Sequence, residues 1–356
     1  MNKNISILNV FKCAGAFMAF TIGSGFATGQ EIMQFFTSSG LHSIGAIAIS
    51  LVLFVYYTSV IIGAGYDYGS SKKYRPYKYF CGEKIGIVYE YFVSILLFLS
   101  VVIMISGSGA TLKEYYGLSY YVGCAMMAIL VLIVFLGGLD GIINIISVIG
   151  PVIVVFSLIV GSIIIFRNFD GFINISDTVN YISVSRTNRN WIESGILYAS
   201  FNMVSSLFFF TSLGYSVDTR EEAVYGSVLG SIILMLVILI MNLALLSQID
   251  EIYNLSIPTL YFAQSISPVL GKIFSVILLC GIFSTAAPNF WVVCTRFENN
   301  KNINMKVLAI ILSVMAFICG LLPFKKLVAI IYPFSGVLGI LLLICIFIKQ
   351  LSKRVI

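Results

Sequence analysis

Apolar stretches separated by short polar segments run along the whole chain. Ten of them approach or exceed the roughly 20 residues that a helix needs to cross a hydrocarbon core. They lie at about 9–38, 41–65, 86–112, 120–139, 142–166, 191–214, 223–248, 270–295, 306–323 and 327–349. The loops between them are short and leave no room for a separate soluble domain. The pattern predicts an all-α integral membrane protein with about ten transmembrane helices in one domain, 1–356.

Composition supports this assignment. Of the 356 residues, 59% are hydrophobic and 10% are charged, whereas soluble domains carry about 25% charged residues. The seven cysteines show no metal-ligand spacing and indicate packing residues. His42 is the single histidine, and no Walker loop is present. We therefore expect no enzyme, no cofactor beyond a coupling ion, and no obligate protein partner.

The 21 lysines and arginines are unevenly divided between the two sides of the membrane. With ten spans and a cytoplasmic N-terminus, 14 of them fall in cytoplasmic segments and seven in outer loops. Positive charge collects on the cytoplasmic side of membrane proteins. We predict a multi-pass protein of the cell membrane with both termini in the cytoplasm. The basic run SSKKYRPYK at 70–78 is then an orienting loop and not a nucleic-acid site.

The ten spans divide into two halves of five, at about 9–166 and 191–349, joined by a polar segment at 167–190. An odd number of spans in each half places the halves in opposite orientations, as in an inverted repeat. Such folds bind solute near the bilayer midplane, against a discontinuous helix at the start of each half. We therefore expect helices 1 and 6 to be discontinuous.

The first span contains a polar, glycine-rich stretch, AFTIGSGFATGQE, at 19–31. Gly23, Gly25 and Gly29 each cost a helix about 1 kcal/mol relative to alanine, so the cluster predicts an unwound segment. Unpaired backbone groups are tolerated at membrane depth only beside protein or a solvated cavity. Close helix packing would explain the glycines, but not the hydroxyls, the amide and the carboxylate among them. We interpret the stretch as a binding site.

The sixth span has a weaker signal. Its polar interruption comprises 199–202 followed by Ser205 and Ser206, with no glycine in the middle. A break is expected there from the repeat, although serine and asparagine could instead bond across helices. After the seventh span, the segment IDEIYNLSIPTLYFAQSISP at 249–268 is too interrupted to cross the membrane. It predicts an outer lid with a short amphipathic helix.

The string GSGF at 23–26, in a chain of ten spans, resembles the amino acid–polyamine–organocation superfamily, whose members often carry GSG-[IV]-F in the first span. The overall frame resembles the LeuT fold and covers nearly the whole chain. The longer string GSGFATGQEIMQFF is similar to the YkvI-type bacterial membrane proteins. The resemblance implies one transporter domain over 1–356 and a solute site at the broken helices.

In that superfamily the unwound GSG presents backbone amides to a substrate carboxylate, in keeping with anion binding at helix N-termini. The resemblance implies that the sixth and third spans complete the site. Carried over, the substrate-binding residues would be Gly23, Ser24, Gly25, Phe26, Ser106, Ser108, Phe201 and Asn202.

The resemblance also implies a sodium site between the first and eighth spans. Sodium-coupled LeuT-fold carriers supply two carbonyls from the first span, and one carbonyl and two hydroxyls from the eighth. The matching positions are Ala19, Ile22, Gly281, Ser284 and Thr285. Oxygen is the ligand that a hard cation prefers. Proton-coupled relatives often carry a lysine in the fifth span, and 142–166 has none, so sodium is favoured.

Glu31 departs from the amino acid carriers, which often have a proline near the end of this motif. A carboxylate within a membrane span is a functional candidate by default. It could pair with a cationic solute group, carry a coupled proton or close an outer gate. It could equally lie in a wetted vestibule and bond Gln34. Its presence admits amines and betaine-like solutes beside neutral amino acids.

These observations predict a secondary active transporter, a sodium-coupled symporter of a small amino acid or a related amine or zwitterion, working by alternating access. Its partners would be a small-molecule substrate and the lipid bilayer. One alternative is a non-transporting membrane receptor for a small amino acid, similar to germinant receptor subunits. Another is a proton-coupled carrier that uses Glu31.

Overall fold

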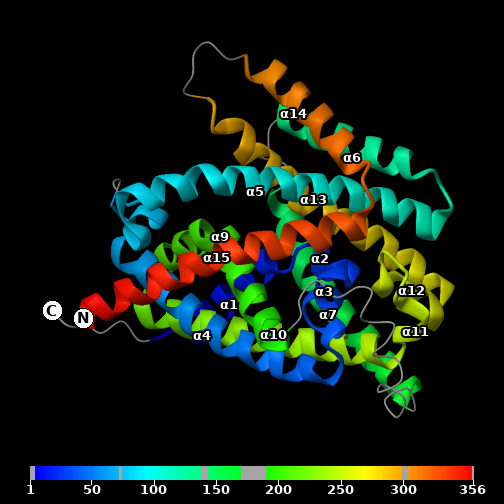
Figure 1. Cartoon of the computed structure of the whole chain (residues 1–356), viewed down its shortest axis with the longest axis horizontal. Coiled ribbons are helices and arrows are strands. Elements are labelled where there is room, and N and C mark those ends of the chain that lie inside the picture. Colours follow the sequence, from blue (N-terminus) through cyan, green and yellow to red (C-terminus); the bar gives the residue numbers. More distant parts are fainter. Residues whose placement is uncertain (1–4, 72–73, 138–142, 170–189, 299–303, 355–356) are drawn as a thin grey trace.

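The computed structural model describes residues 5–71, 74–137, 143–169, 190–298 and 304–354, and within these ranges every regular element is helical (Figure 1). The helices of the first half are α1 (Ile7–Thr21), α2 (Ser24–Thr28), α3 (Gln30–Phe35), the 3-10 helix η1 (Thr37–His42), α4 (Ser43–Tyr68), α5 (Pro76–Tyr116), α6 (Tyr120–Gly137) and α7 (Ile143–Arg167). Those of the second half are α9 (Trp191–Tyr215), α10 (Arg220–Ser247), α11 (Ile249–Ile252), α12 (Pro258–Ile266), α13 (Pro268–Thr295), α14 (Met305–Gly320) and α15 (Phe324–Arg354).

Each of the ten predicted spans falls on one of these helices or, for the first span, on a group of them. Eight helices are long and apolar enough to cross a membrane, and α1 and α14 are shorter apolar helices. The largest difference in bounds is at α5, which begins ten residues before the predicted start. Its first turns bend away at Gly82, whose φ of 77° is accessible to glycine at little cost. Most of the predicted connection at 167–190 lies outside the described residues.

Helix 6 was expected to be broken, and this expectation is wrong: α9 is one continuous helix. The polar side chains in its middle bond to its own backbone. Ser200 Oγ donates to the Ile196 carbonyl at 2.6 Å, Asn202 Nδ2 to the Tyr198 carbonyl at 2.9 Å, and Ser205 Oγ to the Phe201 carbonyl at 3.0 Å. No glycine is present there to lower the cost of unwinding, so these residues remain helical.

Glycines allow several helices to approach closely. A Cβ atom at Gly65 of α4 would lie 2.1 Å from the Thr211 carbonyl oxygen of α9, and one at Gly214 would lie 2.0 Å from the Ile62 carbonyl oxygen. Small residues are what membrane helices use to bring their backbones together. The α4–α9 contact therefore depends on glycine, which has no side chain beyond a hydrogen atom, at both Gly65 and Gly214.

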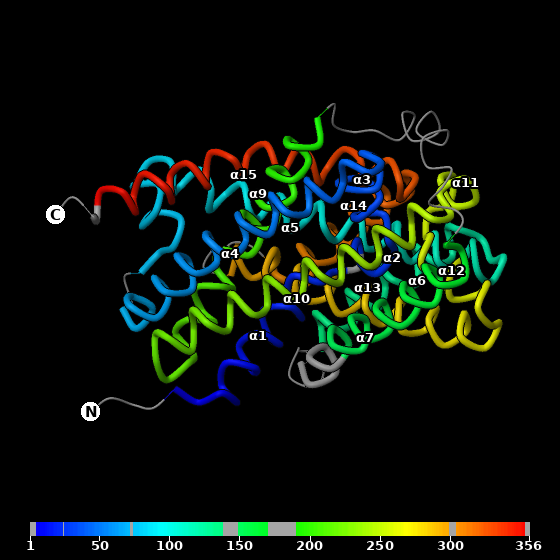
Figure 2. The backbone as a smooth tube through the Cα atoms, turned by 90° about the horizontal axis from the view of Figure 1, so that it is seen from below, coloured from blue at the N-terminus to red at the C-terminus, as the bar shows by residue number. Residues whose placement is uncertain are grey.

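Figures 1 and 2 show both termini at one end of the bundle and the short helices α11 and α12 at the opposite end. We call residues 249–267, which contain these two helices, the lid. The predicted short helix in this segment is confirmed as α12. In the broken first span, several side chains in the first half of α1 are exposed, while the side chains of α3 are buried throughout.

Candidate functional site

The first span is interrupted twice. After α1 ends at Thr21, Ile22 and Gly23 take extended backbone conformations, with ψ values of 91° and −175°. Gly29 then adopts φ 81°, a left-handed conformation that favours glycine, and separates α2 from α3. The predicted break in the first span is therefore confirmed.

A cavity of about 730 Å³ lies beside this break. Its wall is formed by α1, α5, α7, α9, α13 and α15, together with Ile22, Gly23 and the Glu31 side chain. The lining is mainly apolar and includes Phe20, Phe201 and Phe209. Apolar walls with a few placed polar groups are typical of small-molecule sites.

Glu31 is the charged group buried in this wall. Its side chain is 3% exposed, and its Oε1 atom has no hydrogen-bond partner among the described residues. The side chains of Tyr198 and Tyr332 lie near enough to interact electrostatically with the Glu31 carboxylate, and Asn202 Nδ2 donates to the Tyr198 backbone carbonyl at 2.9 Å. A buried carboxylate oxygen without a partner is costly. A ligand in the cavity that supplied a donor or a positive charge to this carboxylate would lower that cost.

Gly25 lies directly against this carboxylate. A Cβ atom placed there would be 2.7 Å from Glu31 Oε2 and 2.5 Å from the Tyr332 hydroxyl oxygen. The space that a side chain would take is therefore occupied by the two polar groups. This contact explains why glycine is required at the third position of the GSG string, independently of helix propensity.

The predicted substrate residues are only partly brought together. Gly23, Phe201 and Asn202 line the cavity, while Phe26 is buried outside its lining. The Ser24 side chain lies outside what the structure describes.

Ser106 and Ser108 do not reach the cavity, so their predicted place in the substrate site is wrong. Ser106 Oγ bonds the Tyr120 hydroxyl at 2.5 Å, and Ser108 Oγ donates to the Gly123 carbonyl at 3.1 Å. Both serines therefore face α6. Their hydroxyls join two packed helices, which is a common use of serine in membrane spans.

Two uncharacterised proteins of Bacillus subtilis (strain 168) are similar to this chain. YyaD is 24% identical over 334 residues, covering 94% of each chain. The membrane protein YkvI is 23% identical over 347 residues, covering 96% of each. The resemblance to YkvI-type membrane proteins is thus confirmed. No protein-family profile matches the chain.

Solved transporter structures match almost the whole chain. A manganese transporter of Eremococcus coleocola has a TM-score of 0.58 at 13% identity, covering 99% of this chain and 88% of its own. MhsT, solved with L-phenylalanine, gives 0.58 at 14% identity, covering 95% and 88%. The nucleobase-cation-symport-1 family transporter Mhp1 gives 0.55 at 14% identity, covering 90% and 74%. The chain has the LeuT fold. The LeuT-fold neighbours are transporters and not enzymes, in agreement with the expectation from composition.

Four of the five residues that the LeuT fold suggested for sodium line the cavity: Ala19, Ile22, Ser284 and Thr285. The Gly23 amide donates to the Thr21 carbonyl and not to Ala19, so the last turn of α1 opens at this point. Ser284 Oγ and Thr285 Oγ1 both donate to the Gly281 carbonyl, at 2.8 and 3.2 Å.

A hydroxyl that donates in this way keeps its lone pairs, which remain available to a cation. Gly281 itself is covered by α7, since a Cβ atom there would meet Ile153 Cδ1 at 2.8 Å. Within the described residues, no group of three or more His, Cys, Asp or Glu side chains could hold a metal ion.

The cavity reaches the surface at one end of the LeuT-fold bundle. Its lining continues along α1 through Ala16 and Gly15 to Lys12, which is exposed. The start of α1 lies toward the end that carries both termini (Figure 2).

The opposite end is closed by the lid. Gln30 Nε2 donates to the Leu255 carbonyl at 2.7 Å, and Thr259 Oγ1 donates to the Ala27 carbonyl at 2.6 Å. The Glu114 carboxylate of α5 also accepts the backbone amides of two lid residues, Ser256 and Ile257. The lid is therefore bonded directly to α2 and α3 on the far side of the break from the open end.

Sequence reasoning missed Tyr198 and Tyr332, the hydroxyl-bearing rings beside Glu31. The available signal was Tyr332-Pro333 followed by Ser335 and Gly336, a polar interruption in the apolar last span. Tyr332 and Ser335 both line the cavity, and Phe201 stacks on the Tyr332 ring at 4.5 Å between centroids.

Proposed function

We propose that this protein is a secondary active transporter that moves a small amino acid, amine or related zwitterion by alternating access. The observation that carries the proposal is the buried Glu31 carboxylate, with an unpartnered oxygen, in the wall of a cavity at the helix break. Secondary transporters bind solutes at discontinuous helices near the midplane. The transport of small solutes by LeuT-fold neighbours supports the same assignment.

The solute would carry a positively charged amine facing Glu31. A buried charge is tolerated when it is paired and hydrogen-bonded, so a ligand ammonium would supply the partner that Oε1 of Glu31 lacks among the described residues. The backbone at Gly23–Gly25 would receive a solute carboxylate, and Phe201 and Asn202 would contact the rest of the molecule. Betaine-like solutes would instead place a methylated cation against the aromatic rings.

Sodium would couple through Ala19, Ile22, Gly281, Ser284 and Thr285. Binding of the ion between α1 and α13 would draw these helices together and favour closure of the open end of the cavity. The solute, bound beside it, would favour the same state. Coupling requires only that both ligands prefer one conformation. With a cytoplasmic N-terminus, the described state would be open to the cytoplasm.

The direct test is a thermal-shift screen of amino acids, amines and betaines on purified protein, in sodium and in potassium. We expect at least one amine-bearing solute to raise the unfolding temperature, and to raise it more in sodium. Uptake of that solute into proteoliposomes should then follow a sodium gradient. Binding without uptake would indicate a receptor. If no amine-bearing compound stabilises the protein, the proposed solute class is wrong.

Proton coupling through Glu31 is the second candidate, because this carboxylate is buried and faces the cavity. It predicts uptake that follows an imposed pH gradient at equal sodium on both sides. Sodium coupling predicts no uptake under that condition.

Removal of the two α13 hydroxyls should eliminate the sodium effect. In Ser284→Ala/Thr285→Ala we expect solute to stabilise the protein equally in sodium and potassium, since two oxygen ligands are absent. Both hydroxyls bond only to the Gly281 carbonyl of their own helix, so stability without ligand should change little. Ser313→Ala, whose hydroxyl bonds Ala128 in another helix pair, is the control. A sodium effect of wild-type size in the double variant would rule out this ion site.

Loss of the Thr259 hydroxyl should loosen the lid. In Thr259→Val the bond to the Ala27 carbonyl is lost, at a cost of about 1 kcal/mol. Amides of the lid should then exchange with deuterium about fivefold faster. Thr295→Val, whose hydroxyl bonds back to Trp291 at the other end of α13, serves as the control and should leave lid exchange unchanged. Equal exchange in the two variants would show that the bond does not hold the lid.

A further inference from the structure

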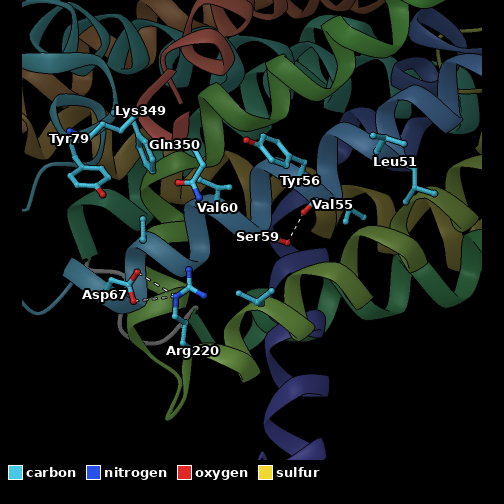
Figure 3. A pocket seen from close by; sticks show the side chains of 14 residues that line it. Leu51, Val55, Tyr56, Ser59, Val60, Asp67, Tyr79, Arg220, Lys349 and Gln350 are labelled. Atoms are coloured by element: carbon cyan, nitrogen blue, oxygen red, sulfur yellow. Dashed lines mark hydrogen bonds and ion pairs between the residues drawn. The ribbon is translucent and has the colours of Figure 1, made fainter. Parts of the chain in front are cut away.

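A second cavity of about 710 Å³ lies between α4, α5, α10 and α15. It shares no lining residue with the cavity at the helix break. Figure 3 shows its two parts: apolar side chains of α4, such as Leu51 and Val55, and a charged end with the Asp67–Arg220 pair and, beside Tyr79, Lys349. The proposed transport function uses none of these residues.

The charged part has an excess of positive charge. Arg220 Nε lies 3.3 Å from Asp67 Oδ1, and its guanidinium rests against Gly63, where a Cβ atom would be only 3.0 Å away. Lys349 places its ammonium 5.3 Å from the centre of the Tyr79 ring. The lining residues therefore include two cations and a single carboxylate.

The apolar part follows α4 through the membrane. From Leu51 to Asp67 the helix rises about 24 Å, more than the roughly 15 Å of hydrocarbon in one leaflet. Val52, in this wall, is 68% exposed, so the cavity borders the outer surface of a membrane-spanning helix. Its charged end lies where α4 ends and α10 begins, at the end of the bundle that carries both termini.

We propose that this cavity binds an anionic glycerophospholipid from the adjacent leaflet. Its phosphate would lie between Arg220 and Lys349, and an acyl chain would follow the α4 wall past Val55 toward Leu51. Basic pockets between transmembrane helices suit lipid head groups. A free phosphate ion would make no use of the apolar wall, and a zwitterionic lipid would not use the net positive charge. The bound lipid would join four helices that meet at this point.

The test is native mass spectrometry of the full chain in detergent, with phosphatidylglycerol and phosphatidylcholine of identical chains. We expect the wild type to retain phosphatidylglycerol preferentially. Each cation contributes about fivefold near the membrane surface, so Arg220→Gln/Lys349→Gln should reduce retention roughly thirtyfold. Lys349→Gln alone, which leaves the Asp67–Arg220 pair intact, should reduce it about fivefold. Lys306→Gln, an exposed lysine outside the cavity lining, should change nothing.

Asp67→Asn separates lipid binding from a purely structural role. It frees Arg220 from its ion pair, so phosphatidylglycerol retention should rise, whereas Arg220→Gln should lower it. If both substitutions lower retention equally, Arg220 acts only as the partner of Asp67 and the proposal fails. Equal retention of the two lipids by the wild type, or displacement of phosphatidylglycerol by equimolar inorganic phosphate, would also overturn it.

Discussion

Replacing Glu31 by glutamine is expected to abolish solute uptake while leaving the protein folded. The substitution keeps the size of the side chain and removes the charge that would pair with a solute ammonium. Loss of one partner from a buried ion pair costs about 3–5 kcal/mol, which is more than a hundredfold in affinity. Initial uptake rates in proteoliposomes and the solute-dependent thermal shift should both fall to background.

The stability of this variant distinguishes a ligand site from a structural group. Since Oε1 of Glu31 has no partner among the described residues, the neutral amide should leave the unfolding temperature unchanged or raise it. Glu222 is the matched control: it is 1% exposed, but it accepts the Ser6 amide at 2.7 Å and the Asn9 side-chain amide at 3.2 Å. Glu222→Gln should lower stability and retain solute binding. If Glu31→Gln lowered stability and retained solute binding, while Glu222→Gln abolished solute binding, Glu31 would not belong to the solute site.

Gly65→Ala is expected to have the largest effect on folding. The new methyl group would lie 2.1 Å from the Thr211 carbonyl oxygen and 2.7 Å from the Thr211 Cα. These are backbone atoms, so relief requires α4 and α9 to separate. Overpacking a well-filled site lowers the free energy of unfolding by about 1–3 kcal/mol. We expect a loss of about 3 kcal/mol here, because the new methyl group would meet backbone atoms. We expect a lower unfolding temperature and little monodisperse protein in size-exclusion chromatography.

Gly15→Ala provides the comparison, because a Cβ atom at this α1 position would meet nothing within 4 Å. Alanine is favoured over glycine in a helix by about 1 kcal/mol, so this variant should be slightly more stable than the wild type. If Gly65→Ala matched it in stability, the close α4–α9 approach would be incorrect.

The sequence predicted the architecture because the membrane imposes a simple pattern. Ten apolar stretches became helices at nearly the expected positions, and the break at Ile22–Gly23 occurred where the glycines lowered the cost of unwinding. Gly29 shows the limit of this reasoning: glycine content indicated a loosened backbone, but not that one left-handed residue would separate two short helices.

The site itself was harder to predict, because polar residues in a span have three uses that composition does not separate. Asn202 and Ser205 bond to their own helix, Ser106 and Ser108 join neighbouring helices, and Glu31 faces a cavity. Only the three-dimensional packing decides among these. The contact of Tyr332 with Gly25 joins the last span to the first, and no local pattern encodes it.

The uninterrupted course of α9 has a mechanical consequence. A helix whose backbone hydrogen bonds are unbroken resists bending. A tilt of α9 at Tyr215 would therefore also move Trp191 at its other end. The first span cannot do this, because the extended residues after Thr21 absorb rotation between α1 and α2. One wall of the cavity therefore contains a helix break and another an unbroken helix, so under the proposed transport function the two halves would move differently.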